Sequence, residues 1–188
     1  MSNSRAAAVL TTPDLAEALH AVRTLLGLAD LSQAEVDFEA TLRTPQALTR
    51  VLRLMPDLKW RALAGEEHGS SESGADPLVC LPVSVHDWCH PLDLAEPFIA
   101  ALGRDSAGVR WDLNGWPEVP EAGLCLITQK YAYLTLSVNS RDLYQDEPAP
   151  DHTVYVHVRD VGLDLDRVEW LAARAGGRFE GKVELSPL

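Results

Sequence analysis

The sequence of 188 residues predicts an α+β protein built from ferredoxin-like β-α-β units, with a mostly antiparallel sheet and helices packed on one face. Two observations predict this class. Segments that alternate apolar and polar residues, the pattern of half-buried strands, are separated by segments with apolar residues at helical spacing. These segments also follow one another as three β-α-β units, and two such units side by side form the ferredoxin-like arrangement.

A helix is predicted first, over residues 13–26. Thr12 is the expected N-cap, and Pro13 takes the first helical position, where no N–H is needed for the helix. Gly27 follows the last apolar residue of the helical pattern and is expected to end the helix. We expect this helix to pack against the sheet as an addition to the β-α-β units.

The first β-α-β unit follows this helix. Residues 35–42 alternate in polarity as a half-buried strand does, and residues 58–62 alternate again. Between them, Thr44 and Pro45 repeat the signal of a cap followed by proline, and apolar residues then recur at helical spacing. The polar residues 66–76 form a loop that closes the unit.

The second unit is predicted to begin with a strand over residues 78–83. Pro82 places this strand at the edge of the sheet, because proline cannot donate a ladder hydrogen bond. Asp93 and Glu96 resemble a capping box at the start of the following helix. Residues 109–113 are expected to return as the second strand of the unit.

The third region is predicted to start with a hairpin formed by residues 124–128 and 131–138. A strand over residues 154–158, a helix over residues 165–175 and a final strand over residues 179–185 complete the last β-α-β unit. The whole chain therefore contains enough elements for two ferredoxin-like sets of strands and helices.

The units predict two halves. Residues 1–113 contain the N-terminal helix and a first ferredoxin-like α+β half, and residues 114–188 contain a second α+β half. A single continuous domain over residues 1–188 is the alternative, because a chain of this length is compatible with one domain or with two small ones.

The charge of the chain restricts its partners. Twenty-eight acidic residues against 16 basic ones give a formal net charge of −12. Phosphate groups need a basic surface, so direct binding of nucleic acid is not expected, and anionic membrane surfaces are disfavoured for the same reason. The acidity is expected first of all to keep the protein soluble, and a basic protein is the easier partner to expect if the acidity also serves binding.

The cysteine content and the N-terminus predict a cytoplasmic protein. Cys80, Cys89 and Cys125 are too few, and odd in number, for a secreted disulfide framework. The apolar run at the N-terminus is too short for the core of a signal peptide, and no later segment is long enough to span a membrane. The helices, rich in Ala, Leu and Arg, are typical of a bacterial protein.

One cluster contains residues that bind metals. Cys80, His86, Cys89 and His90 together supply the nitrogen and sulfur ligands that zinc prefers. In an enzyme, Cys89 would act as a nucleophile with one of the two histidines as its base. The alternative is a polar loop that caps a helix, and no glycine-rich phosphate-binding motif is present in the sequence.

Two tryptophans are candidates for partner binding. Trp88 and Trp116 fall in predicted turns, where an exposed aromatic side chain can anchor an interface. Trp60 and Trp111 fall in predicted strands, where packing in the core explains them. Core or half-buried packing is nevertheless the favoured explanation for Trp88 and Trp116 as well.

The last unit resembles a known family. The segment from Val154 to Leu185 resembles the closing β-α-β unit of the RNase E inhibitor family, and the shared positions are Leu165, Val168, Glu169, Leu171, Ala172, Gly176, Gly177, Phe179 and Gly181. The resemblance implies an acidic, ferredoxin-like protein that acts by binding another protein. Lys182 stands where that family is expected to have an aromatic residue, and glyoxalase-type modules share this outline, so the resemblance assigns no family.

These observations lead to one leading hypothesis. We expect a non-enzymatic, acidic protein-binding protein of the accessory, inhibitor or immunity type, without a cofactor. The alternative is a metal-binding protein or an enzyme that uses the cluster of His86, Cys89 and His90. A homodimer is also predicted, through pairing of the strand from Tyr131 to Val138 with its copy at an open edge of the sheet.

Overall fold

The computed structural model describes residues 4–63, 70–71, 74–128, 132–146, 148–158 and 164–186. The strands are β1 (Ser4–Thr12), β2 (Glu35–Leu42), β3 (Trp60–Ala62), β4 (Val83–His90), β5 (Ser106–Asp112), β6 (Gly115–Trp116), β7 (Ile127–Thr128), β8 (Ala132–Val138), β9 (His152–Val158) and β10 (Val183–Ser186). The helices are α1 (Leu15–Leu26), α2 (Pro45–Leu54), α3 (Ala95–Leu102) and α4 (Leu165–Arg174), with short 3-10 helices η1 (Leu92–Leu94) and η2 (Pro120–Ala122). The predicted α+β class is confirmed.

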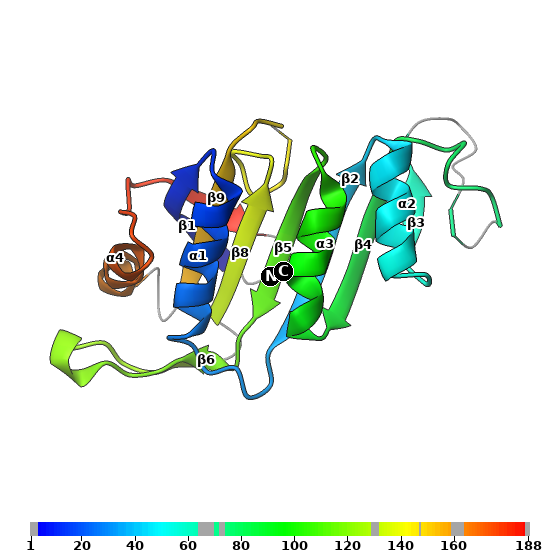
Figure 1. Ribbon diagram of the computed structural model, residues 1–188. Helices are drawn as coiled ribbons and strands as arrows, with labels where there is room; N and C mark the ends of the chain where they lie inside the picture. The colour runs from blue at the N-terminus through cyan, green and yellow to red at the C-terminus, as the bar shows by residue number, and fades with distance from the viewer. Residues whose placement is uncertain are drawn as a thin grey trace.

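Eight strands form one sheet in the order β10-β1-β9-β8-β5-β2-β4-β3, and the neighbouring strands pair antiparallel. Helices α1, α3 and α2 lie side by side on one face of this sheet, and α4 lies next to α1 at the β1 end (Figure 1). The opposite face carries no helix among the described residues. Strands β6 and β7 form a separate two-stranded ribbon.

The sheet consists of two sets of four strands with the same arrangement. Elements β2-α2-β3-β4-α3-β5 give the strand order β5-β2-β4-β3, and elements β1-α1, β8-β9-α4-β10 give the order β10-β1-β9-β8. In each set the last strand lies beside the first, and the third strand lies between the first and the second. The ferredoxin-like description of these sets stays a prediction.

The predicted division after residue 113 falls inside this continuous sheet. Strand β5 from the first predicted half pairs with β8 from the second, and buried side chains of both halves belong to one hydrophobic cluster. Strand β1, at the N-terminus, pairs with β9 and β10 and therefore lies with the C-terminal set. The division into two domains stays a prediction.

The first β-α-β unit is confirmed because its local signals are strong. Strand β2 covers the predicted residues 35–42, and Thr44 caps α2 by accepting the N–H of Ala47 at 3.3 Å.

Helix α1 begins two residues later than expected, since Asp14, not Thr12, is its N-cap. Asp14 accepts the N–H of Ala16 at 2.8 Å, whereas Thr12 ends β1.

Strand β1 was not predicted. Its alanine-rich sequence does not alternate in polarity, because both of its faces are covered and Ala6, Ala7 and Val9 are fully buried. A strand buried on both faces reads as an unbroken apolar run, and alanine is a poor strand former. The apolar residues of this segment therefore predicted only an apolar N-terminus, although residues 4–12 form a strand of the sheet.

The strand predicted over residues 78–83 and the capping box predicted after it are both wrong. Residues 78–83 do not form a strand, because the chain turns at 77–80, where Val79 is 80% exposed, and β4 begins only at Val83. The predicted capping box also does not form, since the carboxylate of Glu96 pairs with Arg23 at 2.6 Å.

The predicted hairpin of residues 124–138 is wrong. Strand β7 pairs with β6, and β8 pairs with β5 and β9 in the interior of the sheet. The premise of the predicted homodimer, an open edge at Tyr131 to Val138, is therefore wrong for the described residues 132–138, and Tyr131 lies outside them. The homodimer itself stays a prediction without this support.

Candidate functional site

The face of the sheet opposite the helices carries polar and charged side chains. In β2, Val36 and Phe38 face the helices, where the ring of Phe38 stacks on that of Phe98 in α3 at 4.3 Å. The residues between and beside them, Glu35, Asp37 and Glu39, point to the other face because side chains alternate along a strand. We call this surface of β4, β2, β5 and β8 the open face.

Arg110 of β5 lies at the centre of a hydrogen-bonded network on the open face. Its Nη2 donates to Oδ2 of Asp37 at 2.7 Å, and its Nε donates to Oδ1 of Asp112 at 2.8 Å. The other carboxylate oxygen of Asp37 accepts the main-chain N–H of Cys89 at 2.9 Å. This network links β5, β2 and β4, and both aspartates raise the pKa of Arg110 against the effect of its burial.

The network continues from Arg110 toward β9 through aromatic rings. The guanidinium lies 5.3 Å from the centre of the Tyr133 ring, and the edge of that ring meets the His157 ring at 5.7 Å between centres. Nε2 of His157 and Oγ1 of Thr135 lie 3.2 Å apart. Burial, aided by Arg110, lowers the pKa of His157 to about 3, so the imidazole is neutral near pH 7.

The carboxylates determine the charge of the site. Burial raises the pKa of Asp112 to about 6, and the nearby Asp37 and Glu35 add to this rise against the opposing effect of Arg110. The pKa of the Cys89 thiol is raised as well. The main cause is a hydrogen bond with Glu35, and burial is the second cause. A thiol held neutral in this way is a poor nucleophile.

We expect Asp112→Asn to stabilise the protein at neutral pH. The raised pKa of Asp112 means that its protonated form stabilises the fold fully below pH 3.8, and that this stabilisation is lost as the pH rises through about 6. A shift of this size corresponds to about 3 kcal/mol, which partial exposure of the carboxylate reduces to about 1–2 kcal/mol. Urea unfolding at pH 7.5 should show this gain, and at pH 4 the gain should vanish. An equal difference between variant and wild type at both pH values would contradict the raised pKa.

A β-bulge in β4 determines where the predicted metal ligands lie. The pairing of β2 with β4 shifts register between Val36 and Phe38, and Cys89 has a positive φ of 62° at this point. His86 pairs opposite Glu39 and faces the open face, whereas the ring of His90 lies 5.4 Å from that of Phe38, on the helix side. The two predicted histidine ligands therefore lie on opposite faces of β4.

The four predicted zinc ligands are not brought together. Cys80 lies in the turn before β4, and Nε2 of His90 lies 3.2 Å from a carboxylate oxygen of Asp87. Across the residues that the structure describes, no group of three or more His, Cys, Asp or Glu side chains is arranged to hold a metal ion. The zinc site predicted from Cys80, His86, Cys89 and His90 has no geometric support.

The two tryptophans predicted to bind a partner differ completely in exposure. Trp88 is 50% exposed on β4, and its ring lies 4.3 Å from that of His86. Trp116 is fully buried, and its Nε1 donates to the main-chain oxygen of His157 at 3.1 Å. The exposure expected for Trp116 is wrong, because Trp116 lies in β6 and not in a turn, and its side chain is buried.

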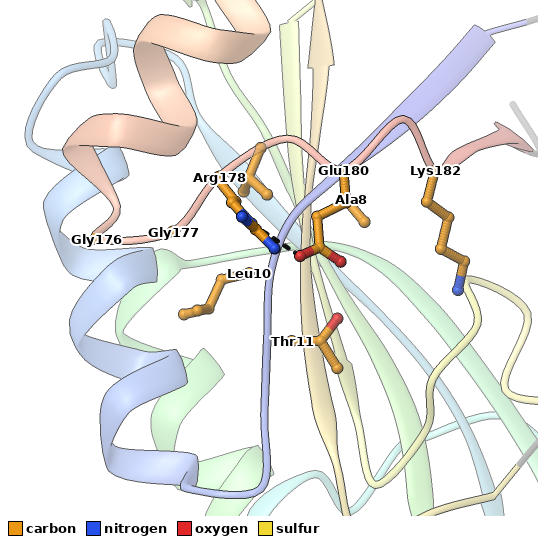
Figure 2. A pocket seen from close by; sticks show the side chains of 9 residues that line it. Ala8, Leu10, Thr11, Gly176, Gly177, Arg178, Glu180 and Lys182 are labelled. Atoms are coloured by element: carbon orange, nitrogen blue, oxygen red, sulfur yellow. Dashed lines mark hydrogen bonds and ion pairs between the residues drawn. The ribbon is translucent and has the colours of Figure 1, made fainter.

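Two of the grooves formed by the described residues lie beside the sheet. One has a volume of about 550 Å³ beside Trp88 and is lined by Glu39, Lys59, Trp60, Arg61, Ser70, Ser71, Ser84 and His86. The other, of about 350 Å³, lies between β1 and the segment after α4 (Figure 2). There Arg178 and Glu180 point toward one another, with their side chains 3.0 Å apart, and are both largely exposed. The charges of Arg178 and Glu180 in the second groove are therefore paired with each other in solvent.

The network around Arg110 could not be predicted from local sequence patterns. Asp37, Arg110, Asp112 and Tyr133 appear in the sequence only as the polar or aromatic positions of strands. They meet because β2 pairs with β5 and β5 pairs with β8 in one register, with Asp37 opposite Arg110 and Asp112 opposite Tyr133. Only the pairing and register of the strands show that these four residues are neighbours.

No protein-family model matches the chain, and no curated protein and no solved structure gives a significant match. The resemblance of residues 154–185 to the RNase E inhibitor family therefore stays a prediction. Among the described residues, no helix is both long and apolar enough to cross a membrane.

Proposed function

We propose that this chain is a non-enzymatic, cytoplasmic protein that binds a basic partner protein through the β4 side of its open face, as an accessory, inhibitor or immunity-type protein. The observation that carries the proposal is the exposure of Trp88 on a strand of the sheet, 50% accessible and beside a groove of about 550 Å³. Exposed aromatic side chains next to a concavity are frequent anchors of protein interfaces.

The charges around Trp88 favour a basic partner. Glu35 and Glu39 are exposed on the neighbouring β2, and Asp112 is partly exposed on β5. Lys59 and Arg61 line the groove beside Trp88. A partner that covers Trp88 therefore gains most when its basic groups lie over β2 and β5, since complementary charges steer association and fix its orientation.

The enzyme alternative has weaker support. A cysteine nucleophile needs a lowered pKa, and the pKa of Cys89 is raised by its hydrogen bond with Glu35. The neutral, buried His157 is hydrogen-bonded to Thr135 and does not line the groove beside Trp88. The carboxylates around Arg110 are better explained as a charged surface than as an acid and a base.

Site-specific photocrosslinking tests the proposal. The photoreactive residue p-benzoylphenylalanine is placed at position 88 in the protein expressed in its own cells, with the exposed Arg53 of α2 as the control position. We expect position 88 to crosslink one discrete protein with a basic isoelectric point, identified by mass spectrometry, and position 53 not to crosslink it. The double variant Glu35→Lys/Glu39→Lys should reduce the yield at least about tenfold, because reversed charges across an interface are strongly disfavoured. Crosslinking that is equal at both positions, or stoichiometric zinc in the purified protein, would overturn the proposal.

A further inference from the structure

A hairpin extends from the body of the protein at the end of the sheet below α4 (Figure 1). It comprises residues 114–128, with the short strands β6 and β7 and the 3-10 helix η2 near its tip. Trp116 pairs with Ile127 near its base, and Val119 and Leu124 exchange main-chain hydrogen bonds of 2.8 and 3.1 Å closer to the tip. We call this segment the arm.

Buried groups of the body fix the arm. Arg167 of α4 is 1% exposed, and its guanidinium donates to the main-chain oxygen of Pro117 at 2.8 Å and to that of Cys125 at 2.6 Å. One side chain therefore holds both sides of the hairpin. At the base, the N–H of Asp30 donates to the oxygen of Gly115 at 2.9 Å.

The exposed part of the arm is apolar and acidic. Leu126 is 62% exposed, although its neighbour Ile127 and nearby Leu124 are buried. The only charged residues within 114–128 are Glu118 and Glu121, both of which are exposed. An arm with an exposed leucine and two carboxylates is complementary to an apolar pocket with basic residues at its rim.

The rigidity of the arm matters for binding. A loop that is ordered before it meets a partner loses less conformational entropy on binding than a mobile loop does. Burying an arginine inside a protein is costly unless its hydrogen bonds are made. Nη1 and Nη2 of Arg167 make theirs to the arm, whereas its buried Nε has no hydrogen-bond partner among the described residues. The hydrogen bond from Arg167 holds the main chain at Cys125, directly before the exposed Leu126, against α4.

We propose that the arm is a second binding element, which inserts Leu126 into an apolar cleft of the same basic partner protein while Glu118 and Glu121 meet basic residues at the rim of that cleft. This inference rests on the proposed protein-binding function and adds to it a separate surface with its own chemistry. Arg167 is a positioning residue in this interaction, because it acts on the partner only through the main chain of the arm.

The test places p-benzoylphenylalanine at position 126, beside the variants with the same residue at positions 88 and 53. We expect positions 126 and 88 to crosslink the same basic protein, and position 53 not to do so. In the variant Glu118→Lys/Glu121→Lys, the yield from position 126 should fall at least about tenfold. Circular dichroism and an unchanged melting temperature establish that this variant is folded, as expected for two exposed residues.

The outcomes separate the two proposals. Crosslinking from position 88 alone overturns the role of the arm and leaves the proposed function in place. Crosslinking from position 126 that does not respond to charge reversal, or that captures a different or acidic protein, also overturns the role of the arm. Absence of crosslinks from both positions overturns both proposals. Arg167→Lys adds a positional readout: it should reduce the yield from position 126 more than the yield from position 88, since a lysine cannot hold both carbonyl groups in the same fork.

Discussion

Trp116→Ala is expected to lower the free energy of unfolding by about 3–5 kcal/mol. The indole is fully buried, and its Nε1 donates to the main-chain oxygen of His157 at 3.1 Å. The truncation therefore leaves a large cavity and also an acceptor without its donor, and both effects destabilise the folded state. Urea unfolding followed by circular dichroism measures this change without depending on tryptophan fluorescence.

Trp88→Ala is the matched control for this variant. It removes the same side chain from a position that is 50% exposed, so the free energy of unfolding should change by less than about 1 kcal/mol. The same variant should reduce binding of the partner, since Trp88 is the proposed anchor. A similar loss of stability in both variants would show that the indole of Trp88 is part of the core.

Gly177→Ala is the second substitution with a large expected effect. A Cβ at this position would lie 2.1 Å from the main-chain oxygen of Val9. That oxygen belongs to β1, which is held between β9 and β10 and cannot move away easily. We expect a loss of about 3 kcal/mol or more in the free energy of unfolding, as for other substitutions that overfill a packed interior.

Gly176→Asn is the control for the second substitution. Gly176 has a φ of +78°, and a Cβ there would meet nothing within 4 Å. Asparagine tolerates this left-handed conformation better than other residues with a side chain, so the loss should stay below about 1 kcal/mol. A larger loss at position 176 than at position 177 would contradict the close approach of Gly177 to β1.

The two glycines also show how far the sequence predicts the structure. Two glycines directly after the helical pattern of residues 165–175 are typical of the end of a helix. The N–H groups of Gly176 and Gly177 donate to the oxygens of Ala173 and Ala172 at 3.4 and 3.0 Å. This is the hydrogen-bond pattern of a Schellman motif, which terminates many helices. The need for glycine at 177 arises from β1, a strand that is distant in sequence, and no local pattern predicts it.

The same distinction holds for the candidate site. Trp88 was selected from the sequence as an exposed aromatic residue, and it is exposed, but the turn predicted around it is a strand. Arg110 and Asp37 were not selected, because their meeting depends on which strands are neighbours and on their register. Local signals such as caps, alternation and proline predicted β2 and α2 correctly. The pairing of strands that are distant in sequence cannot be predicted from any single segment.

The irregular end of β4 has a consequence for the behaviour of the protein at high concentration. Beyond Val85, β4 has no outer neighbour among the described residues, and an open strand edge is a template for aggregation. Here, however, the N–H of Trp88 is bonded to the side chain of Asp87 at 3.1 Å, and Cys89 adopts a φ of 62° in the bulge. An incoming strand cannot form a continuous ladder on such an edge. The bulge thus lets the molecule expose Trp88 to solvent while it discourages the growth of fibrils from the same strand.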